Sequence, residues 1–238
     1  MRRVLLVLVA ALALIGAFPA SAEAEETARA ERVFVFSMPT MSWAEGNDYD
    51  LPHLSALLDE SAIGGLSTRA VDRRTTPGDG YTTLNAGTRA DGDEDFDGLG
   101  FEIGEPYLGQ PAEDVFTRRT GTTVTDGLFT LALPALTEIN DDLDFGAEVG
   151  ALGDALRAGD AHPAVIGTSD GNNEESETVY ARQAVIGLMD SDGLVPGGRV
   201  GDDLLEPAPE APYGRRLDEQ EVVAAFDEAW TDRAVVLV

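Results

Sequence analysis

The chain of 238 residues carries 44 acidic and 16 basic side chains, which gives a formal net charge of −28 at pH 7, and it has no cysteine. Such a charge repels nucleic acid and anionic lipid, and it favours cations, cationic partners or a salty medium. The lack of cysteine excludes disulfides, thiolate zinc sites and thiol catalysis. The length suits one domain with a substantial core.

Residues 1–22 have the order of a cleavable secretory signal peptide. Arg2 and Arg3 precede an apolar run from Val4 to Phe18, and small residues follow at 20–22. The run is shorter than the roughly 20 residues that span a bilayer, so we expect cleavage rather than a membrane anchor. No later stretch is apolar enough to span. We therefore expect a mature chain that is secreted or works at the cell envelope, with residues 23–31 as a polar lead-in.

Alternating strand and helix patterns over residues 32–238 predict an α/β domain with a mainly parallel sheet flanked by helices. Runs rich in β-branched and other apolar residues predict strands at 32–36, 164–167 and 234–238. Apolar residues at helical spacing predict helices at 51–62, 149–158 and 219–230.

Two later segments are predicted to be less regular. Residues 184–189 and 194–200 flank the turn sequence at 190–193, which predicts a hairpin or a strand and bend. Residues 206–213, with three prolines, predict an exposed connector. The apolar run at 234–238 ends the sequence where a parallel sheet normally places a functional loop, which predicts truncation, the alternative being a final edge strand.

Three segments, taken in order, resemble the alkaline-phosphatase-like superfamily, especially its type I phosphodiesterase and sulfatase branches. The first is the strand ending at Phe36 followed by LPHLSALL at 51–58. The second is Thr75-Thr76-Pro77 followed by YTTLNAG at 81–87, and the third is GALGDALRAG at 150–159 leading to the strand at 164–167. The resemblance implies an incomplete core of that fold.

In that family a threonine or serine at the start of a helix attacks phosphorus or sulfur with the help of two metal ions. A metal lowers the hydroxyl pKa and neutralises charge on the transferred group. The resemblance implies Thr75 as the nucleophile, or Thr76 if the register slips by one. Zinc or manganese would be the metal, and a small phosphate or sulfate ester the substrate. The alternative is that both hydroxyls only cap the following helix.

The chain departs from the family pattern at the metal ligands. Where the family has an aspartate after its first strand, this chain has Ser37-Met38-Pro39. Residues 78–80 lengthen the nucleophile segment, and the usual histidine after Gly87 is not visible. Asp79 is a candidate substitute ligand, although an aspartate between two glycines is more often a turn former. The family's remaining ligands come from later segments than this sequence contains.

Few other residues offer metal or catalytic chemistry. His53 and His162 have no histidine partner at metal-binding spacing, and we expect both to be structural. Ser37 and Asp170 each follow a predicted strand, where side chains face a site or simply form a turn.

An acidic segment predicts a calcium loop. Asp93, Asp95 and Asp97, followed by Gly98, fit the start of a D-x-D-x-D-G motif, in which alternating carboxylates converge on one ion. The twelfth position counted from Asp93 is a glycine and not the usual glutamate. The alternative is a solvated acidic loop.

Two functions follow from these patterns. The first is a metal-dependent hydrolase of phosphate or sulfate esters, incomplete or degenerate in this chain. The second is a non-catalytic extracellular binding or cell-envelope domain, stabilised by calcium if the acidic loop holds an ion.

Overall fold

The structure is a computed structural model that describes residues 30–238 apart from 40, 43, 45–50, 67–68 and 173–177. The predicted signal peptide and most of the polar lead-in lie outside the described residues. Glu31–Val238 forms one compact unit.

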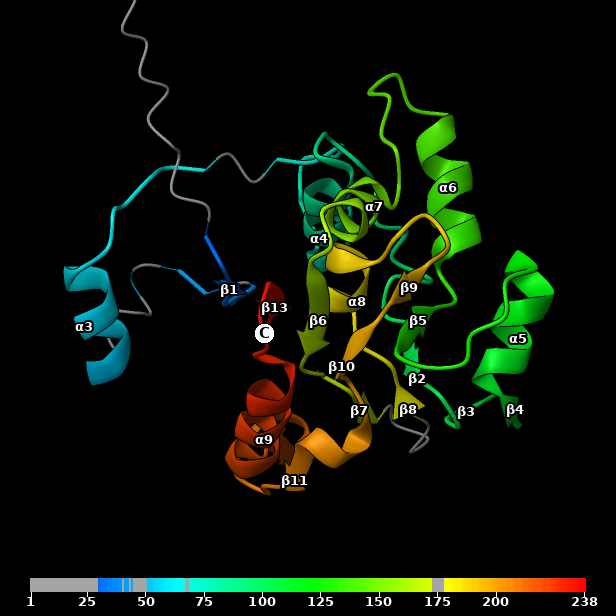
Figure 1. The fold of residues 1–238 in the computed structure, drawn as a ribbon. Helices are drawn as coiled ribbons and strands as arrows, with labels where there is room; N and C mark the ends of the chain where they lie inside the picture. Colours follow the sequence, from blue (N-terminus) through cyan, green and yellow to red (C-terminus); the bar gives the residue numbers. More distant parts are fainter. Residues whose placement is uncertain (1–29, 40, 43, 45–50, 67–68, 173–177) are drawn as a thin grey trace, which may run out of the picture. The chain divides into compact units, whose positions relative to one another are not determined.

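A four-stranded parallel sheet with helices on both faces is the centre of the fold, as the sequence predicted in outline (Figure 1). Its strands lie in the order β1 (Val33–Val35), β13 (Ala234–Leu237), β6 (His162–Ile166) and β10 (Gly197–Arg199). The last strand in sequence therefore lies between β1 and β6, with Phe34 opposite Val236 and Val236 opposite Ala164.

Side-chain alternation along β6 and β13 explains why helices cover both faces. Ala164 and Ile166 pack with Val236 against α9 (Glu219–Ala229), whereas Val165 and Leu237 pack on the opposite face. That opposite face is covered by α4 (Pro77–Ala86), α7 (Ala151–Ala158) and α8 (Ala184–Leu188). Because successive side chains point to opposite faces, a strand covered on both sides must be apolar throughout.

A glycine in α8 brings these layers close together. A Cβ on Gly187 would lie 3.0 Å from the side chain of Leu237 on β13 and 3.2 Å from the ring of Tyr81 on α4. A larger residue there would push α4 away from the sheet.

A second, antiparallel sheet packs against α5 (Ala112–Thr120). It contains β2 (Gly100–Glu102), β5 (Leu128–Thr130) and β9 (Leu194–Val195) in the order β2-β5-β9. Phe101, Phe116 and Phe129 form its buried core. The aromatic ring centroids of Phe116 and Phe129 lie 5.1 Å apart.

The remaining elements are short. The other helices are α3 (Pro52–Asp59) and α6 (Leu133–Asp141), with 3-10 turns η1 (Asp202–Leu204) and η2 (Pro212–Gly214). Three two-stranded pairs complete the described fold: β3 (Pro106–Tyr107) with β4 (Gln110–Pro111), β7 (Gly171–Asn172) with β8 (Thr178–Val179), and β11 (Leu205–Pro207) with β12 (Arg215–Leu217). Within the described residues, no helix has the length and apolar character needed to cross a membrane.

One prediction about the irregular segments was wrong. Ala184–Leu188 is helix α8 and not the first strand of a hairpin, since a short apolar run that is buried all round has no period that separates helix from strand. The connector predicted at 206–213 is largely exposed, but its first two residues belong to β11, which pairs with β12, because a proline is tolerated in an edge strand.

Candidate functional site

Ser37, one of the site candidates predicted from the sequence, lies at the carboxyl edge of the parallel sheet and contacts α4. Ser37, which directly follows β1, donates its backbone N–H to the Val238 carbonyl at 2.7 Å. Its hydroxyl accepts a hydrogen bond from the Tyr81 hydroxyl of α4 at 2.9 Å. The exit of β1 is therefore tied directly to α4.

Helix α4 begins with a reciprocal capping box. The Thr76 hydroxyl accepts the Asp79 N–H at 3.2 Å, and the Asp79 carboxylate accepts the Thr76 N–H at 2.8 Å. Proline at position 77 suits the first turn, because its missing N–H would have no helical partner there. The second carboxylate oxygen of Asp79 accepts the Gly92 N–H at 2.8 Å. Thr76 and Asp79 thus both have defined structural roles, as the capping alternative predicted for Thr76.

Thr75 has a different environment from Thr76. It is half-buried, and its hydroxyl oxygen accepts the Ala70 N–H at 3.0 Å. This bond closes residues 70–75 into a loop and fixes the oxygen immediately before α4. Among the described residues the hydroxyl proton has no acceptor. Thr75 is therefore the predicted nucleophile candidate whose O–H remains free to donate in the described part of the chain.

Asp97 is buried against the first turn of α4. Its side chain is 6% exposed, and a Cβ on Gly78 would overlap its carboxylate. Gln183, the residue before α8, donates its side-chain amide to Asp97 at 3.1 Å. The carboxylate thus joins the acidic loop to both α4 and α8.

Burial raises the pKa of the Asp97 carboxyl to about 6, while the Gln183 hydrogen bond lowers it. The negative charges of Asp79, Glu94 and Asp93 raise this pKa further. Like charges close together disfavour ionisation of the most buried member. The start of α4 is therefore an acidic environment, occupied by carboxylates of the chain itself.

The carboxylates of the predicted calcium loop bind backbone of the loop itself. Asp91 accepts the N–H of Asp93 at 2.9 Å, and Asp93 accepts the N–H of Asp95 at 3.3 Å. Asp95 is exposed, whereas Asp97 points inward to Gln183. In the described ranges no three His, Cys, Asp or Glu side chains converge in a way that could hold a metal. The structure does not bring Asp79, Asp93, Asp95 and Asp97 together as one cation site.

Among the described residues, neither histidine joins two other candidate ligands in a group that could hold a metal. His53 is exposed on α3, and His162 is exposed at the amino end of β6, opposite the edge where Ser37 lies. With Ser37 in place of a carboxylate and no group of three candidate ligands in the described ranges, the donors that the structure describes do not fit a two-metal hydrolase centre.

Asp170, the other strand-end candidate, is part of a buried ion-pair network. Its carboxylate accepts the Ala181 N–H at 2.8 Å and the Arg182 side chain at 2.7 Å. Arg182 is 2% exposed and also binds Glu105 at 2.6 Å. Asp170 therefore anchors the loop after β6 to the second sheet through Arg182, a structural ion-pair role that neither alternative for this strand end specified.

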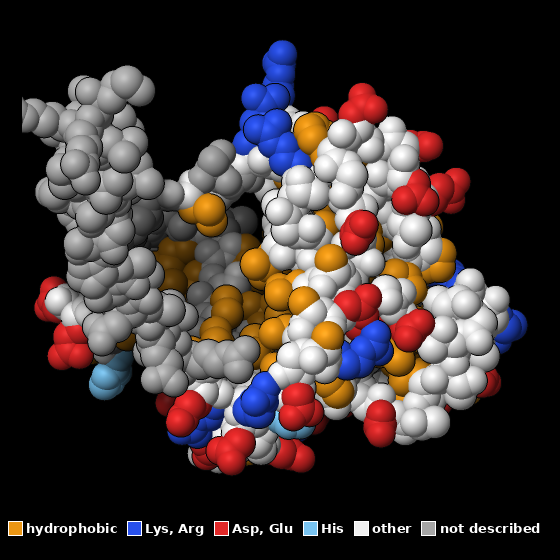
Figure 2. Space-filling view, turned by 45° about the horizontal axis from the view of Figure 1, so that its top comes forward, with side chains coloured by type: hydrophobic (Ala, Val, Ile, Leu, Met, Phe, Trp, Pro, Cys, Tyr) orange, Lys and Arg blue, Asp and Glu red, His pale blue; other side chains and the backbone are white. Residues whose placement is uncertain are grey.

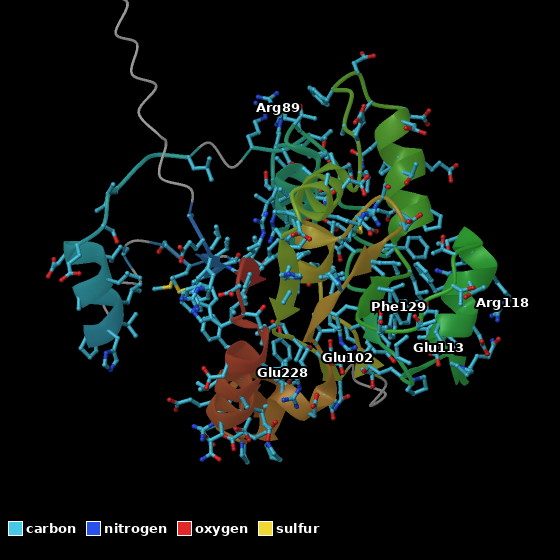
Figure 3. The ribbon with its side chains drawn as sticks, viewed as in Figure 1. Arg89, Glu102, Glu113, Arg118, Phe129 and Glu228 are labelled. Carbon is cyan, nitrogen blue, oxygen red and sulfur yellow. The ribbon has the colours of Figure 1, made fainter. Side chains whose placement is uncertain are left out.

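Glu102 makes a second link between the sheets (Figure 3). It ends β2, and one carboxylate oxygen accepts the N–H groups of Val200 and Gly201, each at 2.7 Å. These groups directly follow the edge strand β10. Glu102 therefore satisfies two buried backbone donors at the end of the edge strand.

Sequence reasoning missed Tyr81, Gln183 and Arg182. Each acts through a partner far away in the chain, so no local spacing marks it. Arg182 alone gave a signal, since an arginine beside a long apolar run in an acidic chain is a candidate for a buried ion pair.

Comparisons with known proteins give no relative: no protein-family model, no curated protein and no solved structure matches the chain.

Proposed function

We propose that this chain is an extracytoplasmic binding domain that keeps the strand, loop and helix layout of an alkaline-phosphatase-like hydrolase without its metal-dependent chemistry. The extracytoplasmic location follows from the signal peptide predicted at residues 1–22. The hydrogen bond between Ser37 and Tyr81 supports the layout, because it joins the exit of β1 to the helix that follows Thr75.

One observation supports a function without catalysis: the carboxylates of Asp79 and Asp97 lie at the first turn of α4. A helix N-terminus ordinarily attracts an anion through its free N–H groups and its dipole. Here one carboxylate caps the helix and a second lies against its first turn. A phosphate or sulfate group at the same place would meet two carboxylates, and the described residues provide no metal centre to offset that repulsion.

The second candidate is ester hydrolysis with Thr75 as the nucleophile. One observation favours it: the Ala70 N–H holds the Thr75 oxygen in a fixed place next to α4, and the O–H stays available. Positioning of this kind is what a nucleophile needs.

One assay separates the two functions. The full chain is purified and incubated with zinc, manganese or calcium and with p-nitrophenyl phosphate, bis-p-nitrophenyl phosphate or p-nitrophenyl sulfate. We expect turnover equal to the metal-only blank, and the same result for Thr75→Ala. Metal-dependent turnover that Thr75→Ala abolishes and Thr75→Ser retains would overturn the binding proposal in favour of the hydrolase.

A further inference from the structure

The tripeptide Arg-Arg-Thr occurs at residues 73–75 and again at 118–120, in two different structural settings. The second copy lies inside α5, where Arg118 and Arg119 each donate a side-chain hydrogen bond to a backbone carbonyl. The first copy lies between α3 and α4, outside any helix or strand (Figure 1). The same three residues therefore belong to a regular element at one place and to an irregular loop at the other.

The arginine side chains of the loop copy have no partner within the part of the chain that the structure describes. Arg73 and Arg74 are exposed, and neither makes a hydrogen bond, an ion pair or an aromatic contact with a described residue. The pair at 215–216, by contrast, forms ion pairs with Asp202 and Glu206. Figure 2 shows the same contrast in general form: several blue side chains project from the top of the face shown, whereas others lie next to red carboxylates.

The backbone of the loop is also held by few contacts. Among the described residues, no backbone–backbone hydrogen bond involves residues 71–75. The bond from the Ala70 N–H to the Thr75 hydroxyl, at 3.0 Å, closes the loop. Segments with few backbone hydrogen bonds open locally at low cost, and exposed loops of this kind are where proteases cut folded chains.

We propose that Arg73 and Arg74 form a cleavage site for an arginine-specific serine protease. Water hydrolyses the peptide bond after either arginine, which leaves a carboxylate on that arginine and an ammonium group on the next residue. Such a protease binds the arginine in a pocket with a carboxylate at its base, and a guanidinium without a partner enters it without first breaking an ion pair. The inference does not depend on the proposed binding function. The export predicted from residues 1–22 brings the chain to proteases outside the cytoplasm.

Cleavage here separates β1 and α3 from α4 along the chain and leaves their contacts in place. Ser37 still donates its backbone N–H to the Val238 carbonyl at 2.7 Å. The ring of Phe34 still packs edge-on against that of Phe226, with centroids 5.2 Å apart. The capping box of α4 begins at Thr76, after the cut. The product is therefore a two-chain protein joined by noncovalent contacts.

Trypsin is a suitable probe, because all 16 basic residues are arginine and each cut identifies one of them. The full chain is digested briefly under native conditions, and the fragments are identified by mass spectrometry. Within Glu31–Val238 we expect the first cut after Arg73 or Arg74, at least about tenfold faster than any cut after Arg118 or Arg119. The nicked protein should elute as one species in gel filtration and separate into two chains in urea.

Paired variants and peptides show whether the structure sets this preference. Arg73→Gln with Arg74→Gln should remove the first cut, whereas the matched control, Arg118→Gln with Arg119→Gln, should leave it unchanged. Synthetic peptides of residues 70–80 and 115–125 contain the two copies without the fold, and we expect trypsin to cut the first no faster than the second.

Three results would overturn the inference. The first is an initial cut elsewhere in the folded unit, including one after Arg69, where the bond joins the buried Ala70. The second is a nicked protein that separates in gel filtration without urea. The third is a pair of peptides that shows the same preference as the folded chain. Because these digests measure no ester turnover, hydrolysis in the earlier assay would contradict the non-catalytic function and leave this inference standing.

Discussion

At the scale of single residues, Asp97 makes the stability of the fold depend on pH. Burial raises the pKa of its carboxyl from 3.8 to about 6, so the folded chain binds this proton more tightly than the unfolded chain does. Its contribution is therefore fully present below about pH 4 and is lost as the pH rises to about 6. We expect Asp97→Asn to raise the free energy of unfolding at pH 8, by an amount on the order of 3 kcal/mol, and to have little effect at pH 3.5. Urea unfolding at both pH values measures this difference.

Asp95 supplies the control for Asp97. It lies two residues earlier in the same acidic loop but is exposed, so Asp95→Asn removes the same formal charge without relieving burial. We expect a small change at either pH. Equal stability of Asp97→Asn and the unchanged protein at pH 8 would show that the carboxylate is not strained by its surroundings.

At the scale of elements, the start of α4 depends on the Thr76 cap. We expect Thr76→Ala to lower the free energy of unfolding by about 1 kcal/mol, because the Asp79 N–H loses its acceptor. Thr76→Ser keeps the hydroxyl and should restore most of that loss. Thermal unfolding of the three proteins compares them, and a Thr76→Ala variant as stable as Thr76→Ser would contradict the capping role.

Some helices and strands could be predicted from the sequence and others could not. The helix at 219–230 and the strands at 164–167 and 234–238 followed from periodicity, and the structure confirms them within a few residues. α8 did not, because a five-residue helix buried on every side has no polar face to reveal its period. Thr75 and Thr76 are neighbours with different roles: the Thr76 hydroxyl caps α4, whereas the Thr75 hydroxyl accepts the Ala70 N–H. That bond spans five residues of irregular backbone, which local propensity does not describe.

The role of Asp170 could not be decided from the sequence for a similar reason. Its place after a strand is shared by site residues and by turn residues, and the choice depends on Arg182, which reaches it from another segment. Partners that come together only on folding leave no local signal in the sequence.

At the scale of the whole molecule, the net charge of −28 opposes the compact state through self-repulsion. Raising NaCl shortens the Debye length to about 3 Å at 1 M, so we expect the melting temperature to rise with salt.

Calcium chloride tests the acidic loop against this effect of salt. The loop carboxylates bind backbone N–H groups and do not converge, so calcium at matched ionic strength should raise the melting temperature no more than sodium does. An additional increase with calcium, lost in Asp93→Asn, would mean that the loop rearranges to bind the ion, since ligand binding to the folded state alone adds stability.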